Sequence, residues 1–239
     1  MLNFAKRNFK ELIRDPLSLI FAIILPIFLL TIFQIIKIPN EIYALKNFTP
    51  GIIIFGFSFV TLFASMLVSK DRSSSLLIRL GVSPMKSRDF ILGYTLSLIP
   101  LIIIQNILFF GVAIMLGLEF SINIILTVLV SIVVSLLFIG IGVLLGSCFS
   151  EKGAPSISSV VIQLVCFTSG MYFPKDVVGK GFDMVCKILP FESALNIIKG
   201  VMNGTEIGMR SILTFGAYTI VIMVVAIVVF NKKMVSDDK

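Results

Sequence analysis

Long apolar runs that contain no charged residue dominate the pattern of hydrophobic and polar positions along this chain of 239 residues. A helix crosses a bilayer with about 20 apolar residues, and one central charge costs roughly 2.5–3.5 kcal/mol on insertion scales, so such runs indicate transmembrane helices. The six charge-free runs are 16–36, 47–69, 90–118, 120–150, 153–174 and 211–231. The pattern predicts an all-α integral membrane protein with six transmembrane helices.

The whole chain, residues 1–239, is predicted to form a single transmembrane domain. The expected spans cover about 16–36, 49–69, 90–117, 121–147, 155–173 and 211–231. The three segments with a different pattern are 1–15, 70–88 and 175–210. Each of them carries charge beside apolar residues, so each is a candidate for a function other than spanning.

Residues 1–15 separate apolar from charged positions on a helical wheel. One side collects Leu2, Ala5, Phe9, Leu12 and Ile13, and the other collects Lys6, Arg7, Lys10, Glu11 and Arg14. This separation is typical of a helix that lies in the membrane interface with its cations toward water or lipid phosphates. Such a helix either anchors the chain to the membrane surface or also contacts a partner protein, and the pattern allows both.

Composition and charge give the expected orientation. Hydrophobic residues make up 57% of the chain and charged residues 14%, against about 25% charged in soluble domains. With both termini cytoplasmic, thirteen of the 20 lysines and arginines fall in cytoplasmic segments, as the positive-inside rule requires. The net charge of +7 is therefore explained without nucleic acid. We expect a multi-pass protein of the cell (plasma) membrane that contacts membrane lipids.

Several kinds of chemistry are missing from the sequence. The chain has no histidine, and no acidic residue falls inside a predicted span, which excludes the usual intramembrane protease sites. There is no G-x-x-x-x-G-K-[ST] motif for ATP, and the three cysteines have neither disulfide nor zinc spacing. We expect no catalytic residue, no metal site and no cofactor in this chain, which is therefore not predicted to be an enzyme.

Neutral polar and small residues do occur within the predicted spans. The four amides are Gln34, Gln105, Asn106 and Gln163. Amides in hydrocarbon seek partners and contribute roughly 0.6–2 kcal/mol when they bond helices together, so they either hold helices or line a substrate path. Two pairs of small residues in the fourth span favour close helix packing. These are Ser131 with Ser135, and Gly142 with Gly146.

The segment 70–88 contains a short apolar-plus-basic stretch, SSSLLIRL, between the second and third spans. Ser73 to Ser75 are typical caps for the start of a helix, and Gly81 with Ser83-Pro84 would end it. The leucines of this helix would form an apolar patch beside Arg72 and Arg79. So short a helix is marginal alone in water, so we expect either a partner or the inner leaflet to pack on it.

This loop resembles the corresponding loop in permease subunits of type-2 ABC transporters, which reads roughly E-R-E-x-G-T-L-E-R-L before a proline and a basic turn. The matching residues are Arg72, Leu77, Arg79, Leu80 and Pro84, and the departures are Asp71, Ser73, Ser75 and Ile78. Other segments are also similar to the family. They are Arg14-Asp15-Pro16 before a first span that contains Pro26, the segment 169–174 (SGMYFP), and Leu189-Pro190 before an amphipathic stretch.

The resemblance implies the membrane subunit of an ATP-driven exporter of drugs, peptides, lipids or polysaccharides. Two permease chains, identical or related, would form the substrate pathway between them. Two separate ATPase subunits, which bind ATP and Mg²⁺, would dock beneath them. The implied ATPase-coupling residues are Asp71, Arg72, Leu76, Leu77, Arg79 and Leu80. The interfacial helix would pack nearby through Lys6, Arg7, Phe9, Lys10, Leu12 and Arg14.

The family also implies short helices that fold back over the outer mouth in segment 175–210, with Pro190 separating two amphipathic stretches. The outer gate would then be formed by Phe173, Pro174, Phe182, Pro190 and Leu195. Two other functions remain open, because the predicted spans carry no ionisable group. One is a passive channel or facilitator, and the other is a membrane scaffold or immunity-type protein without transport of its own.

Overall fold

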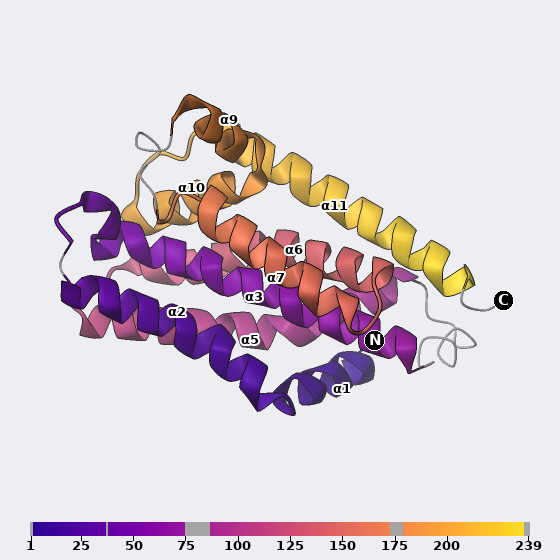
Figure 1. The fold of residues 1–239 in the computed structure, drawn as a ribbon. Coiled ribbons are helices and arrows are strands. Elements are labelled where there is room, and N and C mark those ends of the chain that lie inside the picture. The colour runs from indigo at the N-terminus through magenta and orange to yellow at the C-terminus, as the bar shows by residue number, and fades with distance from the viewer. Residues whose placement is uncertain (1, 37, 75–86, 173–178, 237–239) are drawn as a thin grey trace.

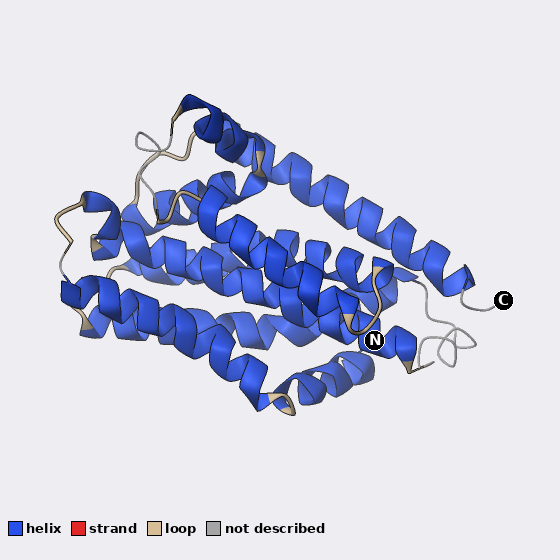
Figure 2. Ribbon diagram, in the orientation of Figure 1, coloured by secondary structure: helices blue, strands red, loops and turns tan. Residues whose placement is uncertain are grey.

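Long helices run side by side in a bundle, and shorter helices lie at both of its ends (Figure 1). This computed structural model describes residues 2–36, 38–74, 87–172 and 179–236. Within these ranges the chain is helix or loop and contains no strand, which confirms the predicted all-α class (Figure 2). The elements in chain order are α1 (Leu2–Ile13), α2 (Pro16–Ile36), η1 (Glu41–Tyr43), α3 (Leu45–Ser73), α5 (Ser87–Met115), α6 (Ile122–Cys148), α7 (Gly153–Thr168), α9 (Lys180–Ile188), α10 (Pro190–Asn203) and α11 (Met209–Ser236).

Five of the described helices, α2, α3, α5, α6 and α11, are long and apolar enough to cross a membrane. The sixth apolar helix, α7, has 16 residues. At 1.5 Å per residue it is about 24 Å long, shorter than a hydrocarbon core of about 30 Å. It stops before Gly170, whose φ of 81° leaves the helical conformation. By helix length, therefore, five spans rather than six are found in the part of the chain that the structure describes.

The central element of the bundle is α3. In its most apolar stretch 89% of the residues are buried, against 17% in α2 and 11% in α11. It packs against α2, α5, α6, α7 and α10. The outer helices instead expose large apolar side chains such as Phe21 on α2 and Leu213 on α11, which suits contact with lipid or with another chain.

Small residues let α3 and α6 approach closely. A Cβ atom on Gly142 would lie 2.4 Å from the carbonyl oxygen of Thr61, and one on Gly146 would lie 2.6 Å from that of Ser65. The hydroxyl of Thr61 donates to the carbonyl of Phe138 at 2.9 Å. The close packing predicted from the glycine pair of the fourth span is confirmed, because no larger side chain fits at either glycine.

The two ends of the bundle differ in what they hold. One end, here called the terminal end, holds α1, the C-terminal part of α11, the last turn of α3 and the first turn of α5 (Figure 1). The opposite end, here called the distal end, holds η1, the turn between α5 and α6, and the short helices α9 and α10. The start of α1 and the end of α11 therefore lie at the same end of the bundle.

Four aromatic side chains form a distal aromatic cluster, which consists of Phe33, Tyr43, Phe48 and Tyr172. The ring centroids of Phe33 and Tyr43 are 4.9 Å apart and stacked, and those of Phe33 and Phe48 are 5.0 Å apart. The Tyr43 hydroxyl donates to the carbonyl oxygen of Tyr172 at 2.8 Å. This contact ties the chain just after α7 to the connection between α2 and α3.

The described part of the segment between α7 and α11 contains the short helices α9 and α10, in line with the short helices expected there. Pro190 occupies the first turn of α10, where a missing N–H is tolerated, and Gly204, with φ of 64°, ends that helix. Of the residues predicted for an outer gate, Pro190 and Leu195 are buried and Phe182 is partly buried. Phe173 and Pro174 lie outside the described residues.

Candidate functional site

The N-terminal helix α1 packs on the terminal end with one face. Its buried residues are Phe4, Ala5, Asn8 and Leu12. Of the predicted apolar side, Ala5 and Leu12 are buried against the bundle, whereas Leu2 is 74% exposed and Ile13 is 54% exposed. Apolar residues occupy two neighbouring sides of this helix, and the side that carries Phe4 is the one that meets α5. The other side leaves Leu2 and Ile13 facing outward.

An aromatic contact fixes α1 to α5 and α11. The Phe4 ring lies edge-on to Phe90 and Tyr94, with centroid distances of 5.5 and 5.0 Å. Phe230 of α11 lies 6.0 Å from Phe90 and 6.3 Å from Tyr94. Such pairs each contribute about 0.5–1.5 kcal/mol beyond the burial of their area. The N-terminal part of α1 is therefore packed against the helix bundle.

Asp71 is a buried carboxylate in the last turn of α3, with a side chain that is 1% exposed. Arg7 donates to its Oδ1 at 2.7 Å, and the Tyr94 hydroxyl donates to its Oδ2 at 2.8 Å. Both carboxylate oxygens thus have a partner, and the guanidinium balances the charge. The hydrogen bond to Asp71 raises the pKa of Arg7, so this arginine remains charged. Through Asp71, three helices meet at one side chain.

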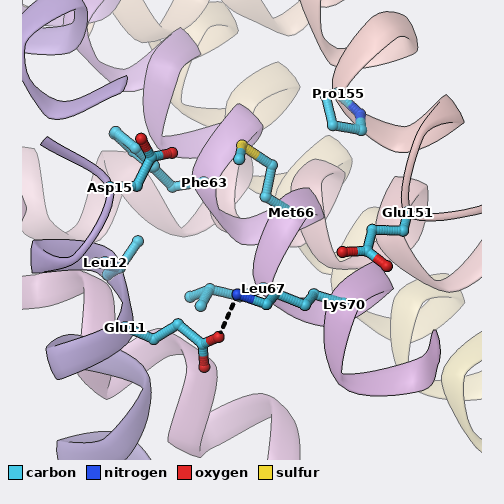
Figure 3. Close-up of a pocket in the computed structure, with 9 residues that line it drawn as sticks. All are labelled: Glu11, Leu12, Asp15, Phe63, Met66, Leu67, Lys70, Glu151 and Pro155. Carbon is cyan, nitrogen blue, oxygen red and sulfur yellow. Dashed lines mark ion pairs between the residues drawn. The ribbon is translucent and has the colours of Figure 1, made fainter. Parts of the chain in front are cut away.

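Lys70 and Glu11 add a second link between α3 and α1. Lys70 Nζ lies 2.7 Å from Glu11 Oε1 (Figure 3). Arg7 also reaches Glu11, at 3.0 Å. Lys70 is 54% exposed, so this pair contributes only about 0–1 kcal/mol. The buried pair at Asp71 is the stronger of the two links.

Arg72 and Ser73 tie the same turn of α3 to the other side of the bundle. Arg72 donates to the carbonyl oxygens of Gly146 at 3.2 Å and of Ser147 at 2.6 Å, which belong to the last turn of α6. Those carbonyls have no partner within their own helix, so a cationic donor suits them. The Ser73 hydroxyl donates to Glu151, in the turn before α7, at 2.6 Å.

Four consecutive residues, 70–73, thus bond to α1, α5, α6 and the turn before α7. We call the set formed by Arg7, Glu11, Lys70, Asp71, Arg72, Ser73, Tyr94 and Glu151 the charged junction. Ser73 is the last residue of α3, and Ser74 is its C-cap. The prediction that Ser73 to Ser75 cap the start of a helix is therefore wrong for Ser73 and Ser74, since Ser73 belongs to α3 and the Ser74 hydroxyl bonds back to the carbonyl of Asp71. Ser75 lies outside the described residues.

A pocket of about 210 Å³ lies beside the charged junction, between α1, α3 and the start of α7 (Figure 3). Its apolar lining consists of Leu12, Phe63, Met66, Leu67 and Pro155. Its charged lining consists of Glu11, Asp15, Lys70 and Glu151. The pocket combines an apolar wall with three carboxylates and one ammonium group.

The residues predicted to couple to an ATPase are only partly described. Asp71 and Arg72 lie in the charged junction, whereas Leu76, Leu77, Arg79 and Leu80 lie outside the described residues. Of the interfacial-helix residues, Lys6, Lys10 and Arg14 are exposed, Arg7 and Phe9 are partly buried, and Leu12 is buried. The exposed cations share one surface of α1 with Asn3.

The four amides predicted within the spans are not brought together. Gln105 and Asn106 are fully buried on α5, where Gln105 donates to the carbonyl of Ala22 on α2 at 3.2 Å. Gln34 donates to the carbonyl of Tyr43 at 2.6 Å, next to the distal aromatic cluster. Gln163 is exposed on α7. In this chain Gln34 and Gln105 act as structural links, and Gln163 alone faces outward.

The sequence did not single out Tyr94 or Glu151. Tyr94 lies in an apolar run and looked like part of a span, and Glu151 lies in a short turn with no motif. Only the charges indicated a contact between these segments. Arg7 and Asp71 have opposite charges, and both of their segments were predicted on the cytoplasmic side of the membrane. Among the described residues, no group of three or more metal-ligand side chains comes together.

Comparison with known proteins supports one family. A search of curated proteins returned no match. The model of the family described as ABC-2 type transporter matches residues 2–203, which run from α1 to the end of α10 and include the charged junction and its pocket. The match and the long apolar helices show a multi-pass membrane protein of the transport permease type. The chain belongs to the ABC-2 type transporter family.

Proposed function

We propose that this chain is the membrane-spanning subunit of an ATP-driven exporter and that segment 70–88 couples it to separate ATPase subunits, which bind ATP and Mg²⁺. The observation that carries this proposal is the charged junction. Four consecutive residues, 70–73, bond to four other parts of the bundle directly before the loop that would meet the ATPase. A loop that only reversed the chain would not need such an attachment.

The bonds of the charged junction make the last turn of α3 a suitable point for transmitting a push. Buried and charge-assisted hydrogen bonds are short and directional, so they resist displacement better than apolar contacts. A displacement of the coupling loop would move Asp71 and Arg72 together with α1, α5 and α6. The helices would then follow as a rigid body, as in other interface-driven transitions.

For the topology, we propose that α7 is a sixth crossing and that the terminal end faces the cytoplasm of a plasma membrane. The helix lies alongside α3 and connects the terminal end to the distal end, from which α11 returns (Figure 1). Its length of about 24 Å is matched by local thinning of the bilayer or by the residues that follow Thr168. The excess of lysine and arginine in the terminal-end segments supports the orientation.

We further propose that two permease chains form the pathway, with α7 lining it. Its outward face carries Val160 and Leu164, which are 55% and 46% exposed, and also Gln163. An amide that faces lipid lacks partners, so Gln163 is better placed against a second chain or a hydrated path. The outer gate at the distal end remains a prediction for Phe182, Pro190 and Leu195.

The test uses the tagged chain purified with its ATPase and reconstituted in liposomes. We expect Arg79→Glu and Leu77→Asp to abolish both ATPase association and ATP-dependent efflux. Lys233→Glu reverses an exposed charge near the end of α11 and is the matched control. This variant should retain ATPase association and ATP-dependent efflux. If association and efflux survive both loop substitutions, the coupling proposal is wrong. Flux without ATP through the chain alone would instead favour a passive channel.

A further inference from the structure

We propose that the pocket beside the charged junction binds the cationic head of an amphiphile, that is, an alkyl- or arylammonium group. The ligand is either a soluble amphiphile or the amine of a lipid head group. The assignment of the pocket as a site for an exported substrate rests on the proposed function, whereas the binding chemistry stands on the pocket itself.

The apolar wall defines where the carbon part of the ligand lies. Leu12, Phe63 and Leu67 are at most 5% exposed and form the floor of the pocket. Lys70 and Glu151 also line the pocket and are exposed, so among the described residues the pocket is not closed off on their side. A volume of about 210 Å³ is below the ~300–1,000 Å³ typical of sites that enclose a drug-sized ligand. The pocket therefore fits a head group and the first carbons behind it.

The carboxylates define the charge of the ligand. Glu11 is neutralised by Lys70 and Arg7. Asp15 and Glu151 form no ion pair with any lysine or arginine that the structure describes, and they lie on opposite sides of the pocket in Figure 3. Asp15 accepts hydrogen bonds from the hydroxyl of Ser18 at 2.6 Å and from its backbone N–H at 3.3 Å, and Glu151 accepts one from the Ser73 hydroxyl at 2.6 Å. None of these donors carries a full positive charge. Lys70 offsets part of the Glu151 charge, but three carboxylates face one ammonium group in the lining. A lining with a net negative charge beside an apolar wall favours a cation with an apolar body.

The pocket is an exception in a strongly basic chain. The net charge is +7, and the neighbouring surface of α1 carries Lys6, Lys10 and Arg14. A carboxylate or phosphate ligand would meet Asp15 and Glu151 and be repelled, although the rest of this end attracts anions. The selectivity expected here is therefore opposite to that of the surrounding surface.

The binding test uses the purified chain without ATPase, in nanodiscs of phosphatidylglycerol, whose head group has no amine. The probe is radiolabelled benzyltrimethylammonium, measured by scintillation proximity with empty nanodiscs subtracted. We expect saturable binding in which tetramethylammonium, which lacks the apolar body, competes at least tenfold more weakly than unlabelled probe. Neopentylbenzene, the neutral carbon isostere, should not compete. Equal competition by neopentylbenzene would overturn the proposal, because charge would then play no part.

The variant Asp15→Asn/Glu151→Gln removes both charges with little change of shape, and Asn remains a good cap for α2. We expect at least tenfold weaker binding in this variant and unchanged binding in Glu206→Gln, which removes an exposed carboxylate at the distal end. A melting temperature equal to that of the natural chain shows that the double variant is folded. Unchanged affinity in the folded double variant would overturn the proposal.

A further arm separates the two sources of the ligand. If phosphatidylethanolamine added to the nanodiscs competes with the probe, the occupant is a lipid amine and the assignment to an exported solute is overturned. If it does not compete, the site belongs to a soluble amphiphile. Binding is measured without ATP, so a chain that binds the probe but shows no ATP-dependent efflux contradicts the proposed function and not the pocket.

Discussion

The two ends of the bundle are held together by different interactions. At the terminal end, the buried Asp71 carboxylate receives hydrogen bonds from Arg7 and Tyr94, and neighbouring residues of α3 bond to α6 and to the turn before α7. At the distal end, the cluster around Phe33 and Tyr43 relies on ring contacts and on hydrogen bonds to backbone carbonyls.

This difference has an energetic consequence. Breaking a buried ion pair leaves a charge without a partner, which costs about 3–5 kcal/mol. A ring contact contributes about 0.5–1.5 kcal/mol and is replaced by another ring contact when side chains shift. On the proposed function, the terminal end is the rigid unit that a partner displaces, and the distal end is the one that rearranges at lower cost.

The largest effect is expected for Arg7→Ala. The substitution leaves Asp71 buried without its cation, and because Arg7 is 38% exposed, water compensates in part. We expect the free energy of unfolding to fall by about 3 kcal/mol, the lower end of the range for a buried pair. The measurement is a denaturant titration in mixed micelles, followed by circular dichroism.

The control for this substitution is Arg14→Ala, which removes an exposed arginine one residue beyond α1. It should change the stability by less than about 0.5 kcal/mol, as surface substitutions usually do. Adding Asp71→Asn to Arg7→Ala should recover part of the loss, since no buried charge then remains. If Arg7→Ala and Arg14→Ala were equally mild, the terminal end would not be held by charge, and the comparison would fail.

A somewhat smaller effect is expected for Gly142→Ala, where α6 meets α3. The added Cβ would lie 2.4 Å from the carbonyl oxygen of Thr61 and 2.5 Å from the Cβ of Ala64, so the two helices must separate. We expect a loss of about 2 kcal/mol, as for overpacked cores. Gly111→Ala on α5 is the control, because no atom lies within 4 Å of its new Cβ, and it should be neutral or stabilising. Equal effects at both glycines would show that the α3–α6 contact is looser than described.

The sequence predicted the helices well and their contacts poorly. Charge-free runs locate α2, α3, α5, α6 and α11, because hydrocarbon thickness imposes a minimum length on each span. The amphipathic helix at the N-terminus and the two short helices around Pro190 also follow from local pattern. The shortness of α7 was missed, since its apolar run continues past Gly170 while the helix does not.

The charged junction could be predicted only in part. The sequence marked Asp71 and Arg72 through the loop motif, and Arg7 through the basic side of the first helix. It could not choose a partner for Asp71, because four cations lie along residues 1–15 and any of them satisfies the charge. The choice depends on which face of α1 meets α5, and that is decided by the packing of Phe4 against Phe90 and Tyr94.

An intermediate loss of stability is expected at Asp15, where two substitutions separate the effect of charge from that of helix capping. The carboxylate accepts hydrogen bonds from the backbone N–H and the hydroxyl of Ser18 in the first turn of α2. Asp15→Ala should cost about 1 kcal/mol, whereas Asp15→Asn should cost only a few tenths, since Asn caps as well as Asp. Thermal and denaturant unfolding of the two variants check this. A large loss in Asp15→Asn would mean that the negative charge itself stabilises the fold.

The smallest effect is expected at the distal end, in Tyr43→Phe. The substitution keeps the ring that stacks on Phe33 and removes the hydroxyl that donates to the carbonyl of Tyr172 at 2.8 Å. We expect a loss of about 0.5–1 kcal/mol, the net value of one neutral hydrogen bond. Tyr218→Phe, on α11, is the matched control and should lose less, as measured by the same denaturant titration. Should Tyr43→Phe cost as much as Arg7→Ala, the distal end would be as firmly fixed as the terminal end, and a gate in that region would have to open against one strong bond rather than several weak ones.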